Sequence, residues 1–186
     1  MTLPRELRVA KTPEGVRLAQ QPVKSPRALR GDARYAPAQS IRPHENLSGG
    51  MQGRTLEINA DIEPGDADAP GLRVFRSEDR AVELRYNVER GSLFLNRFRS
   101  GVTDFNGTFA QAFEAPLSPE EGIPGLQVFV DRSPVEVFTN DGRAVPGGRV
   151  FPHEGSDGLE FIAIGGEAHL HSLTEWRLAS IWNNEG

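Results

Sequence analysis

Apolar and polar residues alternate over residues 126–142, and this stretch organises the rest of the chain. The alternation runs through 126–131 and resumes at 134–139 after a short polar tip, which predicts a β-hairpin. Pro134 has no N–H group for a neighbouring strand, so it should open the second strand or lie at an edge. Asn-Asp-Gly at 140–142 favours the positive φ angles of a tight reversal. Both faces carry large apolar groups, so we expect the hairpin to lie buried between two layers.

The same period of two recurs in short runs along most of the chain. It predicts an N-terminal hairpin from 5–10 and 15–20, and strands at 55–62, 72–76, 81–88, 92–98, 158–164 and 168–181. Ser25-Pro26 predicts one helical turn, with Ser25 as the N-cap. Residues 31–50 lack periodicity and are rich in glycine, proline and polar residues, so we predict a loop there, or an extended segment along the surface.

Three phenylalanines, Phe105, Phe109 and Phe113, recur every four residues, as in a helix. Gly107 and Pro116 disfavour a helix there. About a dozen short strands without a long helix predict an all-β fold, a two-layer antiparallel β-sandwich of the concanavalin-like jelly-roll kind.

Composition narrows the function classes. The 186 residues contain 21 Lys and Arg against 26 Asp and Glu, a net charge of −5, which argues against nucleic acid or an anionic membrane as the main partner. The absence of cysteine excludes disulfides and thiolate chemistry. No apolar run approaches the ~20 residues of a membrane span, and the first residues do not form a secretion signal. As written, the chain is expected to be cytoplasmic or a fragment of a secreted enzyme.

Several short motifs occur in a fixed order along the chain. The strongest is Asp-Arg-Ser-Pro-Val-Glu-Val-Phe at 131–138, followed by Asn-Asp-Gly at 140–142. The others are Leu-Pro-Arg-Glu-Leu at 3–7, Arg-Leu-Ala-Gln-Gln-Pro-Val at 17–23, Arg-Ser-Gly at 99–101 with Asp-Phe at 104–105, Arg-Val-Phe-Pro at 149–152 and Trp-Arg-Leu-Ala-Ser-Ile-Trp at 176–182. Together they resemble the C-terminal β-sandwich module of glycoside hydrolase family 32, which contains levanases, inulinases and invertases.

The resemblance implies an extended segment at the three phenylalanines. It also implies that the catalytic carboxylates lie in a separate five-bladed propeller that precedes the sandwich. Their motifs in the family are Asn-Asp-Pro-Asn-Gly, Arg-Asp-Pro and a Glu followed by Cys, and none occurs here. Asp131 and Glu136 are the most tempting carboxylates, since retaining glycosidases need a pair. The better interpretation is structural, with Asp131 bonded to turn N–H groups and Glu136 paired with an arginine such as Arg132 or Arg149. We assign no catalytic residue, no metal and no cofactor.

Arg97, Arg99 and Asp104 gather polar groups beside Phe98 and Phe105, and they are the candidate sugar-contact residues. Sugar sites combine an aromatic face with bidentate hydrogen bonds, which an arginine can supply. A structural Arg–Asp pair is the alternative interpretation of the same residues.

Two further pairs of residues have competing interpretations. Trp176 and Trp182 are predicted to pack in the core, with a sugar platform as the alternative. His169 and His171 have a spacing that can hold a metal, but no third ligand has a definite place. A polar strand face is therefore the preferred interpretation of the two histidines.

We expect a single domain over residues 1–186, with 1–10 as the remnant of a connection to a propeller. The leading function is a non-catalytic accessory module of a levanase-like or invertase-like enzyme, whose partner is a family 32 propeller or a second copy. In that role it would stabilise or complete the propeller, or help substrate binding or dimerisation. The alternative is a free-standing fructan-binding module. An apolar surface near the N-terminal segment favours the first, and a groove with an aromatic floor favours the second.

Overall fold

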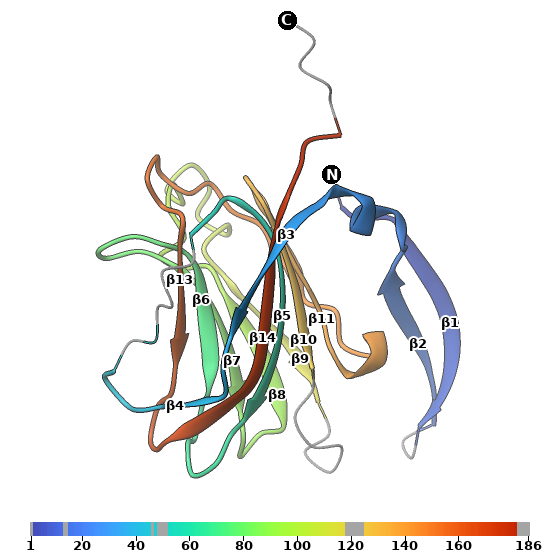
Figure 1. Ribbon diagram of the computed structural model, residues 1–186, viewed down its shortest axis with the longest axis horizontal. Coiled ribbons are helices and arrows are strands. Elements are labelled where there is room, and N and C mark those ends of the chain that lie inside the picture. The colour runs from blue at the N-terminus through green and yellow to red at the C-terminus, as the bar shows by residue number, and fades with distance from the viewer. Residues whose placement is uncertain (1, 13–14, 46, 48–51, 118–124, 182–186) are drawn as a thin grey trace, which may run out of the picture.

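The computed structural model describes residues 2–12, 15–45, 47, 52–117 and 125–181, which form two packed antiparallel sheets and a separate hairpin (Figure 1). The large sheet has seven strands, in the order β12 (Gly147–Arg149), β11 (Pro134–Phe138), β10 (Leu126–Asp131), β5 (Thr55–Glu63), β14 (Ala168–Leu178) and β3 (Arg30–Ala36), with β4 (Gln39–Ile41) also paired to β14. The small sheet has five, in the order β13 (Gly158–Ile162), β6 (Gly71–Arg76), β7 (Val82–Asn87), β8 (Ser92–Asn96) and β9 (Ala112–Pro116). The predicted all-β, two-layer antiparallel sandwich is confirmed.

The hairpin consists of β1 (Arg5–Thr12) and β2 (Gly15–Pro22). In Figure 1 it lies at the right, beside the face of the large sheet that is turned away from the small sheet. The turn η1 (Ser25–Leu29) connects it to β3. Within the described residues, these two strands pair only with each other. The predicted N-terminal hairpin is therefore present, and it stands outside both layers of the sandwich.

The core lies between the inner faces of the two sheets, where alternate apolar residues meet. The large sheet contributes a fully buried set that comprises Leu56, Ile58, Val128, Val130, Val135 and Val137. The small sheet contributes Leu72, Val74, Leu84, Leu93, Leu95 and Phe161 from its own inner face. Burial of these side chains, each contributing about 1.5–3 kcal/mol, holds the layers together.

The central hairpin has the predicted form. Val128 of β10 lies opposite Val137 of β11, and Pro134 is the first residue of β11. Asn140 and Asp141 take positive φ angles of 51° and 54° in the short turn η3 (Asn140–Gly142), as the Asn-Asp-Gly sequence indicated. The face opposite the core is apolar as well, because Phe129 and Phe138 are buried there with their ring centroids 5.9 Å apart.

Of the two alternatives predicted for 31–50, the extended segment is correct for the first part and the loop is wrong there. This segment supplies the strand β3, which pairs with β14, and then the short strand β4. Edge strands are half exposed and tolerate polar residues, so the hydrophobic alternation that marks inner strands is lost. Ser25 is also not the N-cap of η1, because Lys24 takes that position without a side-chain capping bond.

The phenylalanine-rich segment is extended only at its end. Phe113 belongs to β9, whereas Phe105 and Phe109 lie in turns between β8 and β9. The two turn phenylalanines pack against each other and against a third ring instead of extending a strand.

No helix of the described residues is long and apolar enough to cross a membrane.

Val137→Asp should unfold or severely destabilise the domain, because it places an unpaired charge among fully buried valines. We expect a loss of about 4 kcal/mol, or about 10 °C in thermal midpoint. The control is Val16→Asp, since Val16 is exposed on the hairpin and should leave the midpoint nearly unchanged. A Val137→Asp midpoint within about two degrees of the parent would contradict the assigned inner face.

Candidate functional site

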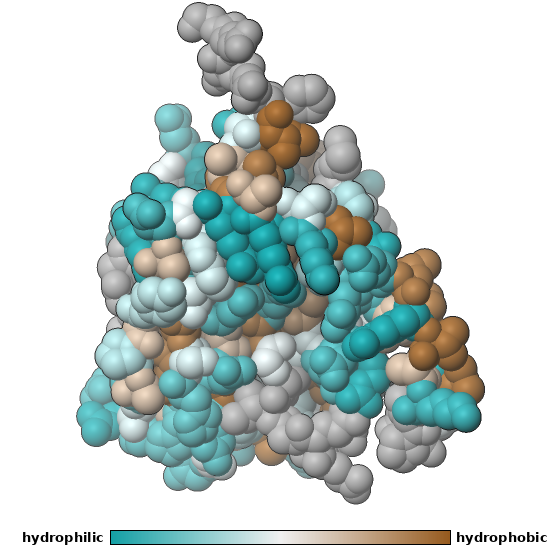
Figure 2. Space-filling model, turned by 45° about the vertical axis from the view of Figure 1, so that its right-hand side comes forward, coloured by the Kyte–Doolittle hydropathy of each residue, from teal (hydrophilic) through white to brown (hydrophobic). Residues whose placement is uncertain are grey.

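The hairpin β1–β2 presents an apolar face to solvent. Leu7, Val9, Val16 and Leu18 are 63%, 73%, 66% and 53% exposed. The pairing of β1 with β2 places all four on one side, because cross-strand partners share a face and side chains alternate along each strand. Figure 2 shows these brown side chains gathered along the hairpin at the right. We call this surface the hairpin face.

The open end of the hairpin is fastened to the sandwich by Glu136. Its carboxylate is almost fully buried and accepts hydrogen bonds of 2.7 Å from the Leu3 backbone N–H and from Arg5 Nη2. Arg5 Nη1 also donates to Gln20 Oε1 at 2.8 Å, and the guanidinium lies 5.4 Å from the Phe138 ring centroid. Charge-assisted bonds of this kind are among the stronger polar interactions in proteins. We call this group of contacts the Glu136 latch.

Glu136 is paired with an arginine, as predicted, but that arginine is Arg5 and not Arg132 or Arg149. The two residues are 131 positions apart, so no local pattern could connect them. At the tip of the central hairpin, between β10 and β11, the Ser133 N–H donates to the backbone carbonyl of Asp131. The Asp131 side chain is exposed. Glu136 therefore has a structural role in joining the N-terminal segment to the large sheet.

A close backbone contact adds to the latch. Gly142, with φ of +78°, lies so near the backbone of Gln20 that a Cβ at this position would collide with the Gln20 carbonyl oxygen. The Arg8 guanidinium also donates to the Asp141 carbonyl at 3.2 Å. The turn η3 thus packs directly on β2, which explains why the sequence has glycine there.

A second buried carboxylate lies on the same outer face of the large sheet. Glu57 is fully buried and accepts hydrogen bonds from both Arg30 and Gln127, the latter at 2.8 Å. The Arg30 guanidinium lies 4.0 Å over the Trp176 ring. Trp176 therefore covers the outer face and is not in the sandwich core, contrary to the prediction. Trp182 lies outside the described residues.

The outer face of the small sheet has a different chemistry. Glu160, which is fully buried, pairs with Arg73 at 3.0 Å and with Arg76 at 3.3 Å. Glu83 pairs with Arg73 and with Arg85 at 2.8 and 3.4 Å. Alternating charges of this kind suit a sheet face that stays in contact with water. The two outer faces of the sandwich are therefore unequal.

Of the candidate sugar-contact residues, Arg97 lies among aromatic rings. Its guanidinium is 4.1 Å from the Phe109 centroid and 4.8 Å from the Phe113 centroid, and its Nη1 donates to the Arg149 carbonyl at 2.9 Å. Burial lowers the pKa of Arg97. Arg99 is exposed and lies 3.6 Å from Asp79, so its acidic neighbour is not Asp104. Asp104 is exposed in the turn that precedes Phe105.

The two histidines of β14 each lie near a glutamate. His171 Nε2 is 2.7 Å from Glu63 Oε2, and His169 Nδ1 is 3.9 Å from Glu167. Glu167 accepts a hydrogen bond from Ser40, which with other contacts lowers its pKa. Among the described residues, no group of three His, Cys, Asp or Glu side chains is placed to hold a metal ion.

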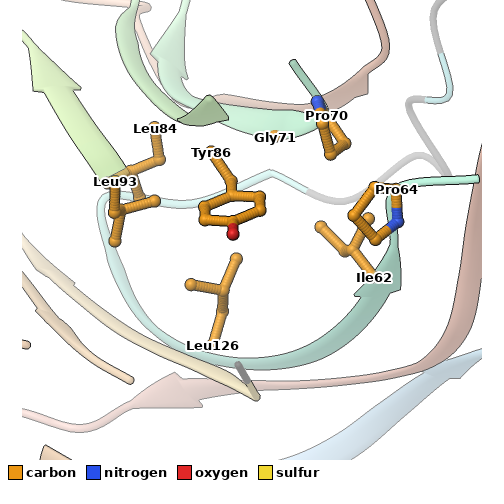
Figure 3. A pocket seen from close by; sticks show the side chains of 8 residues that line it. All are labelled: Ile62, Pro64, Pro70, Gly71, Leu84, Tyr86, Leu93 and Leu126. Atoms are coloured by element: carbon orange, nitrogen blue, oxygen red, sulfur yellow. The ribbon is translucent and has the colours of Figure 1, made fainter. Parts of the chain in front are cut away.

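A small pocket opens between the sheets at one end of the sandwich (Figure 3). Its lining is apolar and includes Ile62, Pro64, Leu84, Leu93 and Leu126. The Tyr86 ring projects into it with the hydroxyl toward Leu126, and burial raises the pKa of that hydroxyl. A lining with so little hydrogen-bonding capacity does not suit a sugar.

Glu175 differs from the other buried glutamates. It is fully buried, and neither carboxylate oxygen has a hydrogen-bond partner among the described residues. Burial raises its pKa, although the charges of Arg34 and Arg177 oppose that effect. The folded domain therefore disfavours the ionised form of this side chain.

These features define a class of protein, a two-layer β-sandwich module with an N-terminal hairpin latched to its large sheet. The chain belongs to glycoside hydrolase family 32, because residues 26–177 match the family described as "Glycosyl hydrolases family 32 C terminal". It is the C-terminal domain of this family of fructan-cleaving enzymes. Sequence reasoning identified the family correctly.

Its relatives are longer proteins. A levanase of Bacillus subtilis (strain 168) is 38% identical over 97% of this chain and 27% of the relative. A levanase of Bacillus sp. (strain L7) is 34% identical over the whole chain and 20% of the relative. The chain thus spans about a quarter or less of these curated relatives.

Solved structures share the fold at lower sequence identity. An exo-inulinase from Aspergillus awamori matches with a TM-score of 0.85 and 24% identity, over 98% of this chain and 36% of that one. A fructan 1-exohydrolase IIa from Cichorium intybus matches with a TM-score of 0.80 and 15% identity, over 96% and 41%. These likenesses support the sandwich fold.

The buried Glu175 predicts a pH-dependent stability. Because its folded pKa lies above the unfolded value, stability falls as pH rises from the unfolded pKa through the folded pKa. Glu175→Gln should raise the thermal midpoint by about 3 °C at neutral and higher pH. The gain should disappear below about pH 4, where the unfolded carboxyl is protonated too. Glu89→Gln is the exposed control, and destabilisation by Glu175→Gln at neutral pH would contradict the prediction.

The Glu136 latch predicts a local effect of Arg5→Met. The hairpin should lose its fastening, so amide exchange should accelerate in β1 and β2 while the large sheet stays protected. Arg5→Met with Glu136→Met should recover global stability lost in the single variant, with a coupling of about 1–3 kcal/mol. Arg8→Met is the control at an exposed bond. Unchanged exchange in the hairpin of the Arg5 variant would disprove the latch.

Proposed function

We propose that this chain is the non-catalytic accessory module of a levanase-like or invertase-like glycosidase, and that it docks the catalytic domain through the hairpin face. The observation that carries the proposal is the arrangement of the hairpin, which is latched to the sandwich at its open end through Arg5 and exposes aliphatic residues along the rest of its length. A surface of this kind is typical of a site for another protein.

The position of the hairpin along the sequence supports this role. The family profile begins at residue 26, whereas the levanase relatives align with almost the whole chain. Residues 5–22, which form the hairpin, therefore lie outside the sandwich module but inside the region shared with the longer enzymes. We propose that the hairpin, and not only residues 1–10, connects the sandwich to the preceding domain.

The physical chemistry of the hairpin favours an occupied state. A two-stranded hairpin is marginally stable by itself, and its outer edges expose unpaired backbone groups. The latch holds the open end of the hairpin, but the aliphatic side chains of Leu7, Val9, Val16 and Leu18 stay in water. A partner that packs on these side chains and pairs with an edge strand would bury the exposed apolar surface and satisfy the unpaired backbone groups. Stable interfaces bury about 800 Å² on each side, which a hairpin and its surroundings can supply.

A second copy of the chain is the other occupant that the hairpin face accommodates. In that case, the exposed aliphatic residues of two hairpins would cover each other across a two-fold axis. Titration with a catalytic domain separates the two states, since a dimer formed through the same face must dissociate before the domain can bind.

The test mixes the purified chain with the separately expressed catalytic domain of a levanase. We expect a one-to-one complex in light scattering, and Val9→Ser with Leu18→Ser should weaken it at least tenfold by removing the central apolar pair. Ile164→Ser is the matched control, because Ile164 is exposed on the loop between β13 and β14. A chain that binds neither the catalytic domain nor itself, or binding unaffected by the hairpin variant, would overturn the proposal.

A further inference from the structure

Three phenylalanine rings from two separate loops form an exposed cluster. The Phe105 centroid is 4.6 Å from that of Phe109 and 5.3 Å from that of Phe151, and Phe109 and Phe151 are 5.5 Å apart. Phe105 is 57% exposed and Phe151 is 39% exposed. We call these three residues the aromatic patch. Rings that pack together and stay open to water provide a ready surface for an apolar ligand face.

Arg97 lies beneath the patch and fixes its position. Its guanidinium lies over the rings of Phe109 and Phe113 while Nη1 donates to the Arg149 carbonyl. The Arg97 N–H also donates to the Gln111 carbonyl at 3.3 Å, which ties the two ends of the phenylalanine loop together. The patch therefore combines aromatic faces with a held cationic donor.

The two loops are joined by their backbones. The Val102 N–H donates to the Phe151 carbonyl at 2.9 Å. Gly101 takes a φ of +133° and approaches the Phe151 carbonyl so closely that a Cβ would collide with it. Glycine is required there by both the conformation and the space. The loops thus hold the rings in place before any ligand arrives, which reduces the entropy lost on binding.

The charges around the patch have both signs. Arg99 and Asp79 lie 3.6 Å apart, and Asp79 is also 3.6 Å from Arg80 Nε. Asp104 is exposed next to Phe105. A rim of mixed charge offers both donors and acceptors to hydroxyl groups, and it gives no strong field that would attract a polyanion.

We propose that the aromatic patch, with Arg97 beneath it and Asp104 at its rim, is a binding site for a neutral oligosaccharide. The C–H groups of the sugar would lie on Phe105 and Phe151, and its hydroxyl groups would bond to the rim. The assignment of the sugar as a fructo-oligosaccharide rests on the proposed function. The site lies on the sandwich itself and is distinct from the hairpin face.

The two exposed apolar surfaces differ in composition, and each composition suits a different kind of partner. The hairpin face is aliphatic and lies on an unpaired two-stranded sheet, which suits a protein partner. The aromatic patch is formed by three rings in loops with charged neighbours, an arrangement that suits the C–H faces and hydroxyl groups of a sugar.

The test titrates the chain with oligosaccharides cut from levan and from inulin, followed by amide NMR and calorimetry. We expect shifts confined to residues near Phe105 and Phe151. Phe105→Ala should weaken binding about tenfold through loss of the ring face. Asp104→Asn keeps the ring and should also weaken binding, which guards against a folding artefact in the first variant.

Tyr35→Ala is the matched control. Tyr35 is an exposed aromatic residue on β3, at the opposite edge of the large sheet from β12, which adjoins the patch at Arg149. Its removal should leave affinity unchanged. Absence of binding, or equal loss in the Tyr35 variant, would overturn the inference. Equal affinity for a cello-oligosaccharide would overturn the assignment of the sugar as a fructo-oligosaccharide. Because the hairpin residues are unaltered, catalytic-domain binding can still be measured separately in each variant.

Discussion

The carboxylate of Glu136 joins the N-terminal hairpin to the β-sandwich. The alternation of apolar and polar residues along each strand does not by itself connect these two parts. The carboxylate lies on the outer face of β11, is nearly removed from water, and accepts bonds from the start of the chain at Leu3 and Arg5. A buried carboxylate requires partners, so the N-terminal segment has to lie against the large sheet. The orientation of the hairpin, and with it the exposure of its aliphatic face, depends on this group.

The sandwich itself depends on a simpler rule. Inner residues of both sheets alternate with outer ones, and this local pattern made the central hairpin, the strands of the small sheet and the fold class predictable. The strand β3 could not be predicted in this way, because an edge strand is defined by its pairing with β14 and not by its own composition. The resemblance of the motifs to family 32 supplied the family that the pattern could not.

The functional surfaces were only partly visible in the sequence. The expectation of an apolar surface near the N-terminus followed from the family resemblance, but the separation of Arg5 from Glu136 hid the latch. The residues of the aromatic patch, Phe105 and Phe151, lie in loops far apart along the chain, so their contact also depends on tertiary structure. The motif at 3–7 contains Leu3 and Arg5, and the motif at 131–138 contains Glu136. Both motifs carried the family resemblance, and together they were the part of the sequence that could have indicated the latch.

The inequality of the two outer sheet faces has a consequence for the module in isolation. The small sheet carries paired arginines and glutamates on its outer face, with the arginines partly exposed to water, so that side resists association. The aliphatic hairpin lies on the opposite side, beyond the large sheet. If two molecules associate through their hairpins about a two-fold axis, each hairpin covers the other and neither stays free for a third molecule. Assembly through the hairpin would then end at pairs and would not continue into filaments.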